Sequence, residues 1–472
     1  MLGQNPSQPA LFQMIDIESL VPQGHRLRQI DAALDLGFVR EALAECYTPG
    51  WGRPSIDPEL ALRMMILGVL YDLSDRQLCD EIRMHAGYRW FCRLNFHDSV
   101  PNHSTLSRLR NERWAKSDVF TLLFEEVLKG CVSEGMVSGR HVSVDGTQIR
   151  ANASMHSLER TETDDPEGND EPPEEPVTEK VAKEPQPEGA WEGRGERYSN
   201  QTHTSSTDPD ARLYRKGKGK SASLSYLIHD IIDTKSRVIL GRRASIATGT
   251  AERDVALELI REHEARRSIL GLDQAVEVLT GDTGYGASSF VSDLVDLDIT
   301  PHVPLQAASE PEELPSWQRR TFNLARYRKR RVAVRLAEAR NKVRLESSGH
   351  AYAVSRRLRI RSEHIFAEAK NEHGLGRARH RLLSKVDRQS QLVATVQNLK
   401  RLSQALRRKA QEAAAAGFYH FGTLYHTLWR AVADWNAAWP ANRNENHSRL
   451  IAAYAATSAC LRVRMTACST AF

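Results

Sequence analysis

The stretch HVSVDGTQI, residues 141–149, decides the fold class of this chain. Apolar and polar residues alternate along it, which is the period of a half-buried strand, and Asp145-Gly146 predicts a turn at which the strand ends. Residues 1–135, in contrast, place apolar side chains at helical spacing and predict an all-helical region. The chain therefore changes from helices to strands near residue 140, where we expect a second domain to begin.

The elements expected after this first strand have a definite order. Two strands, SLSYLIHDIID and SRVILGRRASI, come next and are joined by a turn at Asp233-Thr234-Lys235. The pattern then predicts a helix at 250–267, a strand at 275–280, a helix at 288–298 and a strand at 299–304. A basic linker at 319–344 and two helices at 358–374 and 386–416 follow. A three-stranded meander followed by strands that alternate with helices is the order of an RNase H-like α/β fold, a mixed sheet with flanking helices. Such a match concerns the fold and does not by itself indicate a function.

We expect three parts in the 472-residue chain. A helical N-terminal domain covers residues 1–135, the RNase H-like domain covers 136–410, and a tail without a readable motif covers 411–472. Residues 155–212 are rich in Glu, Asp, Pro, Ser and Thr. They cannot bury enough apolar surface to offset the entropy of ordering, so we predict a disordered acidic insert there.

Composition excludes several classes of protein. Hydrophobic residues make up 40% of the chain, yet no stretch reaches the ~20 apolar residues that a membrane span needs. The N-terminal residues lack the pattern of a signal peptide, so we expect a cytoplasmic protein with no membrane partner. Six cysteines without a CxxC pair are typical of reduced thiols rather than of disulfides or zinc. The net charge of +5 understates the basic character of the rest, because residues 159–192 are strongly acidic.

Three acidic residues, Asp145, Asp282 and Glu363, stand where phosphodiester chemistry would need them. Asp145 and Asp282 each follow an apolar strand, and these two strands are neighbours in an RNase H-like sheet, so the two carboxylates could converge. Cleavage of a phosphodiester requires an activated water and a stabilised leaving oxygen, which two metal ions can supply. Carboxylates suit Mg²⁺, and without a metal they would repel one another when crowded together. The three acids therefore predict a Mg²⁺ site.

Glu363 lies on a predicted helix between two basic residues. At about 100° per residue, Arg359, Glu363 and Lys370 fall within about a 40° arc, so one face presents an acid flanked by cations that could grip phosphates. Taken singly, these features have simpler explanations. An Asp before Gly is typical of a turn, and a Glu among basic residues is typical of a solvated helix face. Only their joint occurrence in this order of elements indicates a site.

The most basic segment of the chain is residues 319–344. Its centre, Arg328, Lys329, Arg330 and Arg331, could follow the phosphates of DNA, in which case binding should weaken steeply with salt. A solvated helix would explain the charge as readily. The position of the segment just before Glu363 favours the interpretation as a DNA-binding segment.

These residues also carry a family resemblance. The chain resembles the DDE transposases of bacterial insertion sequences over about residues 20–406. The blocks that carry the resemblance are LVPQGHRLRQID, GRPSIDPELALRMMILGVLYDLSDRQL, RWFCRL, VPNHSTLSRLR, VDGTQIRANAS, DPDARLYRKGKGKSASLSY, ATGTAERDVALELI, LTGDTGYGASSFV, TPHVP, RSEHIFAEAKNEHGLGRARHRLLSK and VQNLKRL.

The resemblance assigns roles to single residues. The first and second Asp of the family match Asp145 and Asp282. The family's Glu, with a Lys after a spacer of six residues and an Arg four residues before it, matches Glu363 with Lys370 and Arg359. Related enzymes often have a Tyr three residues before that Arg, where this chain has Arg at position 356. The neighbouring acid, Glu368, lacks the spacing to a Lys.

What the resemblance implies is metal-dependent cleavage at the ends of an insertion sequence, followed by strand transfer into target DNA. The implied cofactor is Mg²⁺, with Mn²⁺ as a substitute, and the implied partners are the terminal repeats and the target DNA. Two ends must be brought together, so a homodimer or larger assembly on DNA, in the nucleoid, is expected. SDRQLCDEI and the helix after it could form a helix-turn-helix variant. A structural or dimerising bundle is an equally good interpretation of residues 1–135.

Two other functions use the same residues. A metal-dependent nuclease on this fold would cleave without joining. A decayed transposase could bind DNA without acting on it, although Asp145, Asp282 and Glu363 are all present.

Overall fold

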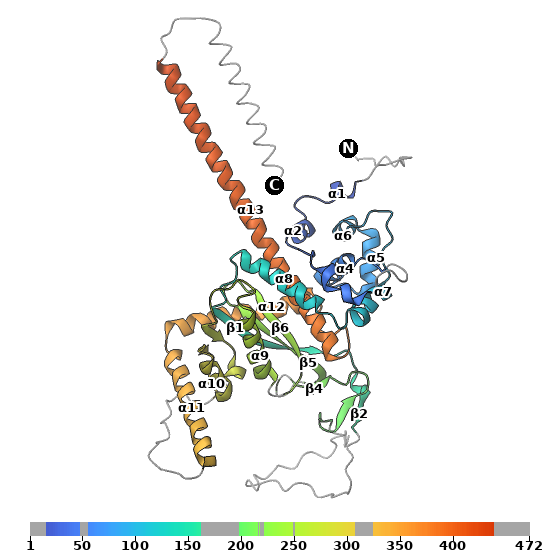
Figure 1. Ribbon diagram of the computed structural model, residues 1–472, viewed down its shortest axis with the longest axis vertical. Coiled ribbons are helices and arrows are strands. Elements are labelled where there is room, and N and C mark those ends of the chain that lie inside the picture. Colours follow the sequence, from blue (N-terminus) through green and yellow to red (C-terminus); the bar gives the residue numbers. More distant parts are fainter. Residues whose placement is uncertain are drawn as a thin grey trace, which may run out of the picture. The chain divides into compact units, whose positions relative to one another are not determined.

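The computed structural model describes residues 16–47, 55–161, 198–215, 217, 221–248, 251–306 and 324–438 (Figure 1). The chain divides into two compact units. The first, called the helical unit here, comprises Met1–Leu67, Ser74–Arg110 and Asn398–Phe472. The second, called the α/β unit, comprises Gly68–Leu73 and Asn111–Gln397. Within the described ranges, no helix combines the length and the apolar character that crossing a bilayer demands.

The first unit contains short helices, as the spacing of apolar residues predicts. In chain order they are α1 (Ile17–Leu20), α2 (Arg26–Ala32), α3 (Val39–Ala42), η1 (Ala44–Cys46), α4 (Pro58–Leu70, which continues into the second unit), α5 (Asp75–Met84), α6 (Ala86–Phe91) and α7 (His103–Arg108). A π-helical turn, η2 (Leu109–Arg113), follows and leads into the α/β unit. The interior is apolar, and Leu62, Ile66 and Phe91 are fully buried.

Capping residues set where these helices begin. Ser74 caps α5 in a capping box with Gln77. α5 ends before His85, whose side chain caps α6 by accepting from the backbone of Tyr88. Asn102 caps α7, because its Oδ1 accepts from the backbone N–H of Ser104 at 2.9 Å.

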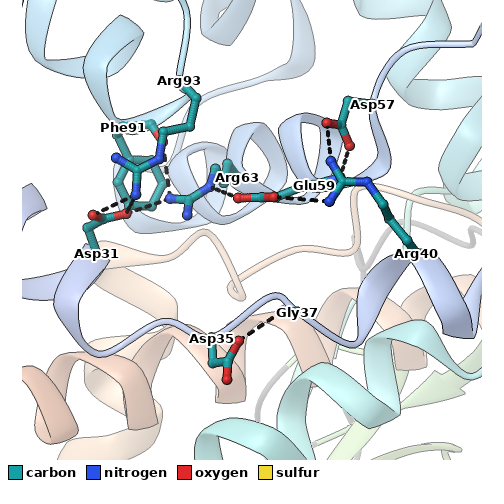
Figure 2. Close-up of polar contacts among 9 residues, drawn as sticks. All are labelled: Asp31, Asp35, Gly37, Arg40, Asp57, Glu59, Arg63, Phe91 and Arg93. Carbon is teal, nitrogen blue, oxygen red and sulfur yellow. Dashed lines mark hydrogen bonds and ion pairs between the residues drawn. The ribbon is translucent and has the colours of Figure 1, made fainter.

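A network of alternating charges connects the helices of the first unit (Figure 2). Arg63 of α4, whose side chain is 5% exposed, donates to Glu59 at 2.9 Å and to Asp31 of α2 at 2.6 Å. It also donates to the backbone carbonyl of Phe91 at 3.2 Å. The network continues on both sides through the ion pairs Arg93–Asp31, Arg40–Glu59 and Arg40–Asp57. Each of these carboxylates therefore has a guanidinium partner.

The centre of the α/β unit is a six-stranded mixed sheet (Figure 1). Its strands are β1 (His141–Arg150), β4 (Arg212–Tyr214), β5 (Ser223–Asp233), β6 (Ile239–Ile246), β7 (Val278–Thr280) and β8 (Thr300–His302). Along the sheet the order is β4-β5-β1-β7-β8, and β6 pairs with β5 as well. β1, β5 and β6 are antiparallel, whereas β7 and β8 run parallel to β1. The expected RNase H-like fold class is confirmed.

The first strand is longer than the sequence pattern predicts. The expected turn at Asp145-Gly146 is wrong, because β1 continues to Arg150 and pairs with β5 over its whole second half. Ile149 is fully buried on this stretch. Burial and the ladder of hydrogen bonds with β5 outweigh the local preference of Asp-Gly for a turn.

Helices and small elements complete the second unit. They are α8 (Val119–Ser133), η3 (Met155–Ser157), β2 (Leu158–Arg160), β3 (His203–Ser205), α9 (Ala251–Arg266), η4 (Thr283–Tyr285), α10 (Ser288–Asp296), α11 (Leu324–Ser347), α12 (His350–Glu372) and the first part of α13 (Leu383–Ala438). α8 ends before Gly135, which has a φ of +68°. α9 packs against β5 and β6, and α12 packs against β1, β7 and β8.

Two expectations about irregular segments need correction, those of the basic linker and of the acidic insert. The basic linker is a helix from residue 324 onward, α11, because Val334, Ala337 and Val343 form a buried face at helical spacing. The tail expected to begin at 411 continues α13 through residue 438, and residues 439–472 lie outside the described ranges.

The acidic insert is also partly wrong, since its ends are folded. Residues 155–161 and 198–212 contribute η3, β2, β3 and the start of β4. Asp208 is fully buried there, and its Oδ1 accepts from the Tyr226 hydroxyl at 2.6 Å and from the Leu382 backbone at 3.0 Å. Hydrogen bonds, which composition does not reveal, order these polar ends. The middle of the insert, residues 162–197, lies outside the described residues.

Candidate active site

Strand register brings Asp145 and Asp282 to the same level of the sheet. Ser143 of β1 is paired with Thr280 of β7 in a parallel ladder. Each aspartate lies two residues beyond its member of that pair. β7 ends at Thr280, so β1 has no strand beside it on this edge at Asp145. Both side chains are half-buried where the parallel strands diverge.

Asp145 is in an environment that disfavours its negative charge. The pKa of Asp145 is raised to about 7, chiefly by burial and to a smaller extent by the nearby carboxylates of Asp282 and Asp230. The Gly146 N–H, which donates to Asp145 at 2.9 Å, and the Arg359 guanidinium act in the opposite direction. A cation placed between the aspartates would relieve this repulsion.

Asp282 is held in place by the turn that follows it. Its Oδ1 accepts from the backbone N–H of Gly284 at 2.8 Å, and it caps the one-turn helix η4. The motif Asp282-Thr283-Gly284-Tyr285 therefore fixes the carboxylate at the end of β7.

Tyr285 and Glu252 belong to the same neighbourhood, although they were missed from the sequence. Tyr285 is 1% exposed, and among the described residues its Oη has no hydrogen-bond partner. Burial raises the pKa of Tyr285 well above its usual value, and the carboxylates of Glu252, Asp145, Asp282 and Asp230 add to this. Tyr285 could have been suspected from its place in the GDTGYG motif. Glu252 is an ordinary first-turn acid of α9, and no sequence signal distinguishes it.

Glu363 and Arg359 lie one turn apart on α12. Arg359 Nη2 is 3.5 Å from Glu363 Oε1, and the Glu363 side chain is 60% exposed. Arg359 also acts electrostatically on Asp145. The structure thus places the two aspartates near each other. Arg359 contacts Glu363 and also lowers the pKa of Asp145.

Lys370, two turns farther along α12, contacts β1. Its Nζ donates to Thr147 Oγ1 at 2.6 Å and to the backbone carbonyl of Gln148 at 3.0 Å. Glu368 faces elsewhere, because its carboxylate accepts from Gln397 at 3.1 Å and lies 3.7 Å from His373. Among the described residues, Glu368, Glu372 and His373, at the C-terminal end of α12, could together hold a metal ion.

A buried ion pair supports the floor of the site. Asp230 is opposite Asp145 in the β1–β5 ladder. It accepts two hydrogen bonds of 2.6 Å from Arg242 of β6, and both side chains are fully buried. The Arg242 guanidinium lies 5.8 Å from the centre of the Phe366 ring of α12. This pair connects the strands below Asp145 to the helix that carries Glu363.

The predicted DNA-binding cluster lies at the start of α11. Arg328, Lys329 and Arg331 are exposed and Arg330 is half-buried. Arg331 lies 6.0 Å from the ring centre of Tyr327. Exposed basic side chains on a helix can contact phosphates, but contact with DNA stays a prediction.

Taken together, the donor set fits a hard divalent cation. Two carboxylates at one level of a sheet edge, with further acids beside them, offer the oxygen ligands that Mg²⁺ and Mn²⁺ take.

The comparisons with known proteins concern both units. A family model described as a transposase domain matches residues 15–112, and one described as a transposase DDE domain matches residues 139–399. Among solved structures, the chain is similar to the crystal structure of the Mos1 mariner paired end complex with Mn, at 12% identity over 73% of this chain and 90% of that chain. The TM-score is 0.17, so this likeness carries no argument. No curated protein matches the chain.

Proposed function

Because the chain belongs to the family of transposase DDE domains, which covers residues 139–399, we propose that it is a DNA transposase of an insertion sequence. It cleaves the DNA at the ends of the element and joins the freed 3′-hydroxyl groups to target DNA. The observation that carries the proposal is the register of β1 and β7, which puts Asp145 and Asp282 at the same level. Burial and the nearby carboxylate of Asp282 both disfavour the negative charge of Asp145, and a cation bound beside it would offset this cost.

We assign the metal ligands and catalytic residues as Asp145, Asp282 and Glu363, with Mg²⁺ as the ion and Mn²⁺ as a substitute. A divalent ion bound there would lower the pKa of an attacking water and stabilise the leaving oxygen. Asp145 and Asp282 hold fixed positions because β1, β7 and the Gly284 N–H position them. Glu363, which is exposed beside Arg359, completes the set from α12.

Basic residues around these acids bind the phosphates of DNA in this proposal. Arg359 is the nearest, since it acts on Asp145 and contacts Glu363. Lys370 anchors α12 on β1 through Thr147 and can serve a phosphate from that position. The exposed start of α11 extends the positive surface through Arg328, Lys329, Arg330 and Arg331.

The remaining parts of the chain receive roles on functional grounds. Residues 1–135 recognise the terminal repeats or dimerise, residues 136–410 catalyse, and no role is assigned to residues 411–472. Two ends must be held together for joining, so the protein acts in the nucleoid as a homodimer or larger assembly on DNA.

The test uses the full chain with labelled duplexes that carry candidate element ends. With Mg²⁺ or Mn²⁺, the wild type should cleave these ends and should transfer pre-cleaved ends into a plasmid. Asp145→Asn, Asp282→Asn and Glu363→Gln should each lose both activities. The control is Asp254→Asn, which removes an exposed acid of α9, and it should remain active.

Two results would replace the proposal. Cleavage without joining of pre-cleaved ends would make the protein a nuclease on the same fold. Binding of ends without either reaction, by the wild type and the variants alike, would make it a DNA-binding protein derived from a transposase.

A further inference from the structure

A fourth acid, Glu252, lies against the aspartate pair. It is half-buried in the first turn of α9, and this helix contacts both β1 and η4. A Cβ placed on Gly146 would lie 3.5 Å from Glu252 Oε1, and one placed on Gly284 would lie 3.6 Å from Glu252 Oε2. Gly146 directly follows Asp145 and Gly284 is the turn residue that binds Asp282. One carboxylate thus reaches the backbone beside both aspartates.

Tyr285 provides an independent observation of the same arrangement. Its ring is buried against Phe290, with ring centres 5.5 Å apart, and among the described residues its hydroxyl has no partner. Among the carboxylates that raise the pKa of this hydroxyl, Glu252 has a larger effect than Asp145 and Asp282. A buried hydroxyl within range of these acids marks one common pocket of negative charge.

Such an arrangement is unfavourable without cations. The positive end of the α9 dipole offsets only part of one charge. The glycines at 146 and 284 leave the space beside Glu252 free of side-chain carbon. Divalent cations would offset the repulsion among the carboxylates of Asp145, Asp282 and Glu252.

We propose that Glu252 is a metal ligand of the active site, together with Asp145 and Asp282. This inference rests on the proposed function. It changes the composition of the site, because a ligand comes from α9 in addition to the two strands and α12. The expected ligand is a hard divalent cation, since all the donors are carboxylate oxygens.

The experiment measures Mn²⁺ binding to the full chain without DNA, by electron paramagnetic resonance and calorimetry. Glu252→Gln keeps the size of the side chain and removes its charge, and we expect it to weaken Mn²⁺ binding by roughly 10–100-fold. The matched control is Asp254→Asn, which changes an exposed acid in the same first turn of α9. It should bind Mn²⁺ as the wild type does.

The outcomes separate this inference from the proposed function. If Asp145→Asn loses Mn²⁺ binding while Glu252→Gln binds normally, Glu252 is not a ligand and the proposed function stands. If Asp145→Asn and Asp282→Asn also bind Mn²⁺ as the wild type does, the proposed function itself is wrong. A purely structural role would lower the metal-free melting temperature of Glu252→Gln without changing its affinity for Mn²⁺. Should Glu252→Gln not fold, Glu252→Asp decides: weaker Mn²⁺ binding supports the inference and unchanged binding overturns it.

Discussion

The carboxylates of the Arg63 network in the helical unit and those of the candidate site in the α/β unit have opposite kinds of neighbour. In the helical unit, Asp31 and Glu59 both accept from the buried guanidinium of Arg63 (Figure 2). In the α/β unit, Asp145 and Asp282 lie beside each other and beside further acids. Acids that alternate with arginines are satisfied within the fold, whereas acids that face one another need a cation from outside it. The first arrangement stabilises the fold, and the second is the one to which we assign metal binding in the proposed function.

Asp145→Asn is the strongest test of this contrast. Cleavage should fall on the order of 1000-fold or more, equivalent to about 4 kcal/mol of barrier. The metal-free melting temperature should not fall, because the substitution removes a repelled charge. Parallel cleavage assays and thermal melts in a chelator measure both effects. A large loss of stability would show that Asp145 stabilises the fold, and the two units would then not differ in the role of their carboxylates.

Asp230→Asn asks whether pairing, rather than location, decides the role of an acid. Asp230 lies beside the site, but it is fully buried with Arg242. Breaking such a pair leaves an uncompensated buried cation and should lower the free energy of unfolding by about 3–5 kcal/mol. Urea unfolding gives this value directly. A stable protein with lost activity would instead place Asp230 among the functional acids.

Asp31→Asn should show the corresponding cost in the helical unit. It weakens the contacts to Arg63 at 2.6 Å and to Arg93 at 2.9 Å, for an expected loss of about 2 kcal/mol. The control is Asp80→Asn, which alters the exposed pair with Arg83 and should cost less than about 1 kcal/mol. Equal effects of both substitutions on urea unfolding would refute a structural role for the network.

Acid pH should destabilise the α/β unit through a buried histidine. Burial lowers the pKa of His263 to about 4, and among the described residues neither ring nitrogen has a hydrogen-bond partner. The unfolded chain has a higher pKa, about 6.5, so this contribution to stability is complete above pH 6.5. It is lost as the pH falls toward 4, and by pH 5 the loss is about 2 kcal/mol. Between pH 7 and pH 5 the melting temperature of His263→Leu should fall less than that of the wild type. An equal fall for both proteins would show that His263 does not cause the loss of stability at acid pH.

The fold could be predicted because its signals are local and periodic. The alternation around Asp145, the paired apolar runs of β5 and β6, and the helical spacing of α9 all survive in the structure. The predictions that were wrong concern segments whose structure depends on partners far away in the sequence. β1 continues past Gly146 because β5 lies beside it, and Asp208 is ordered by Tyr226 and Leu382, far away in the sequence.

The candidate site divides in the same way. The proximity of Asp145 and Asp282 could be predicted, because each is an acid that follows an apolar run in a known element order. The position of Glu252 beside them could not, because an acid in the first turn of a helix is usually explained by the helix dipole. Its position comes from the packing of α9 on β1 and η4, which sequence spacing does not encode.

The parallel pairing of Ser143 with Thr280 has a consequence for how this protein can evolve. Neighbouring residues of an extended chain point to opposite faces, so shifting a strand by one position reverses the direction of every side chain after it. An insertion or deletion of a single codon between the ladder and either aspartate would turn that carboxylate away from its neighbour while leaving the amino acid itself intact. Natural variants that keep both carboxylates at the site should therefore also keep the number of residues between the ladder and each aspartate.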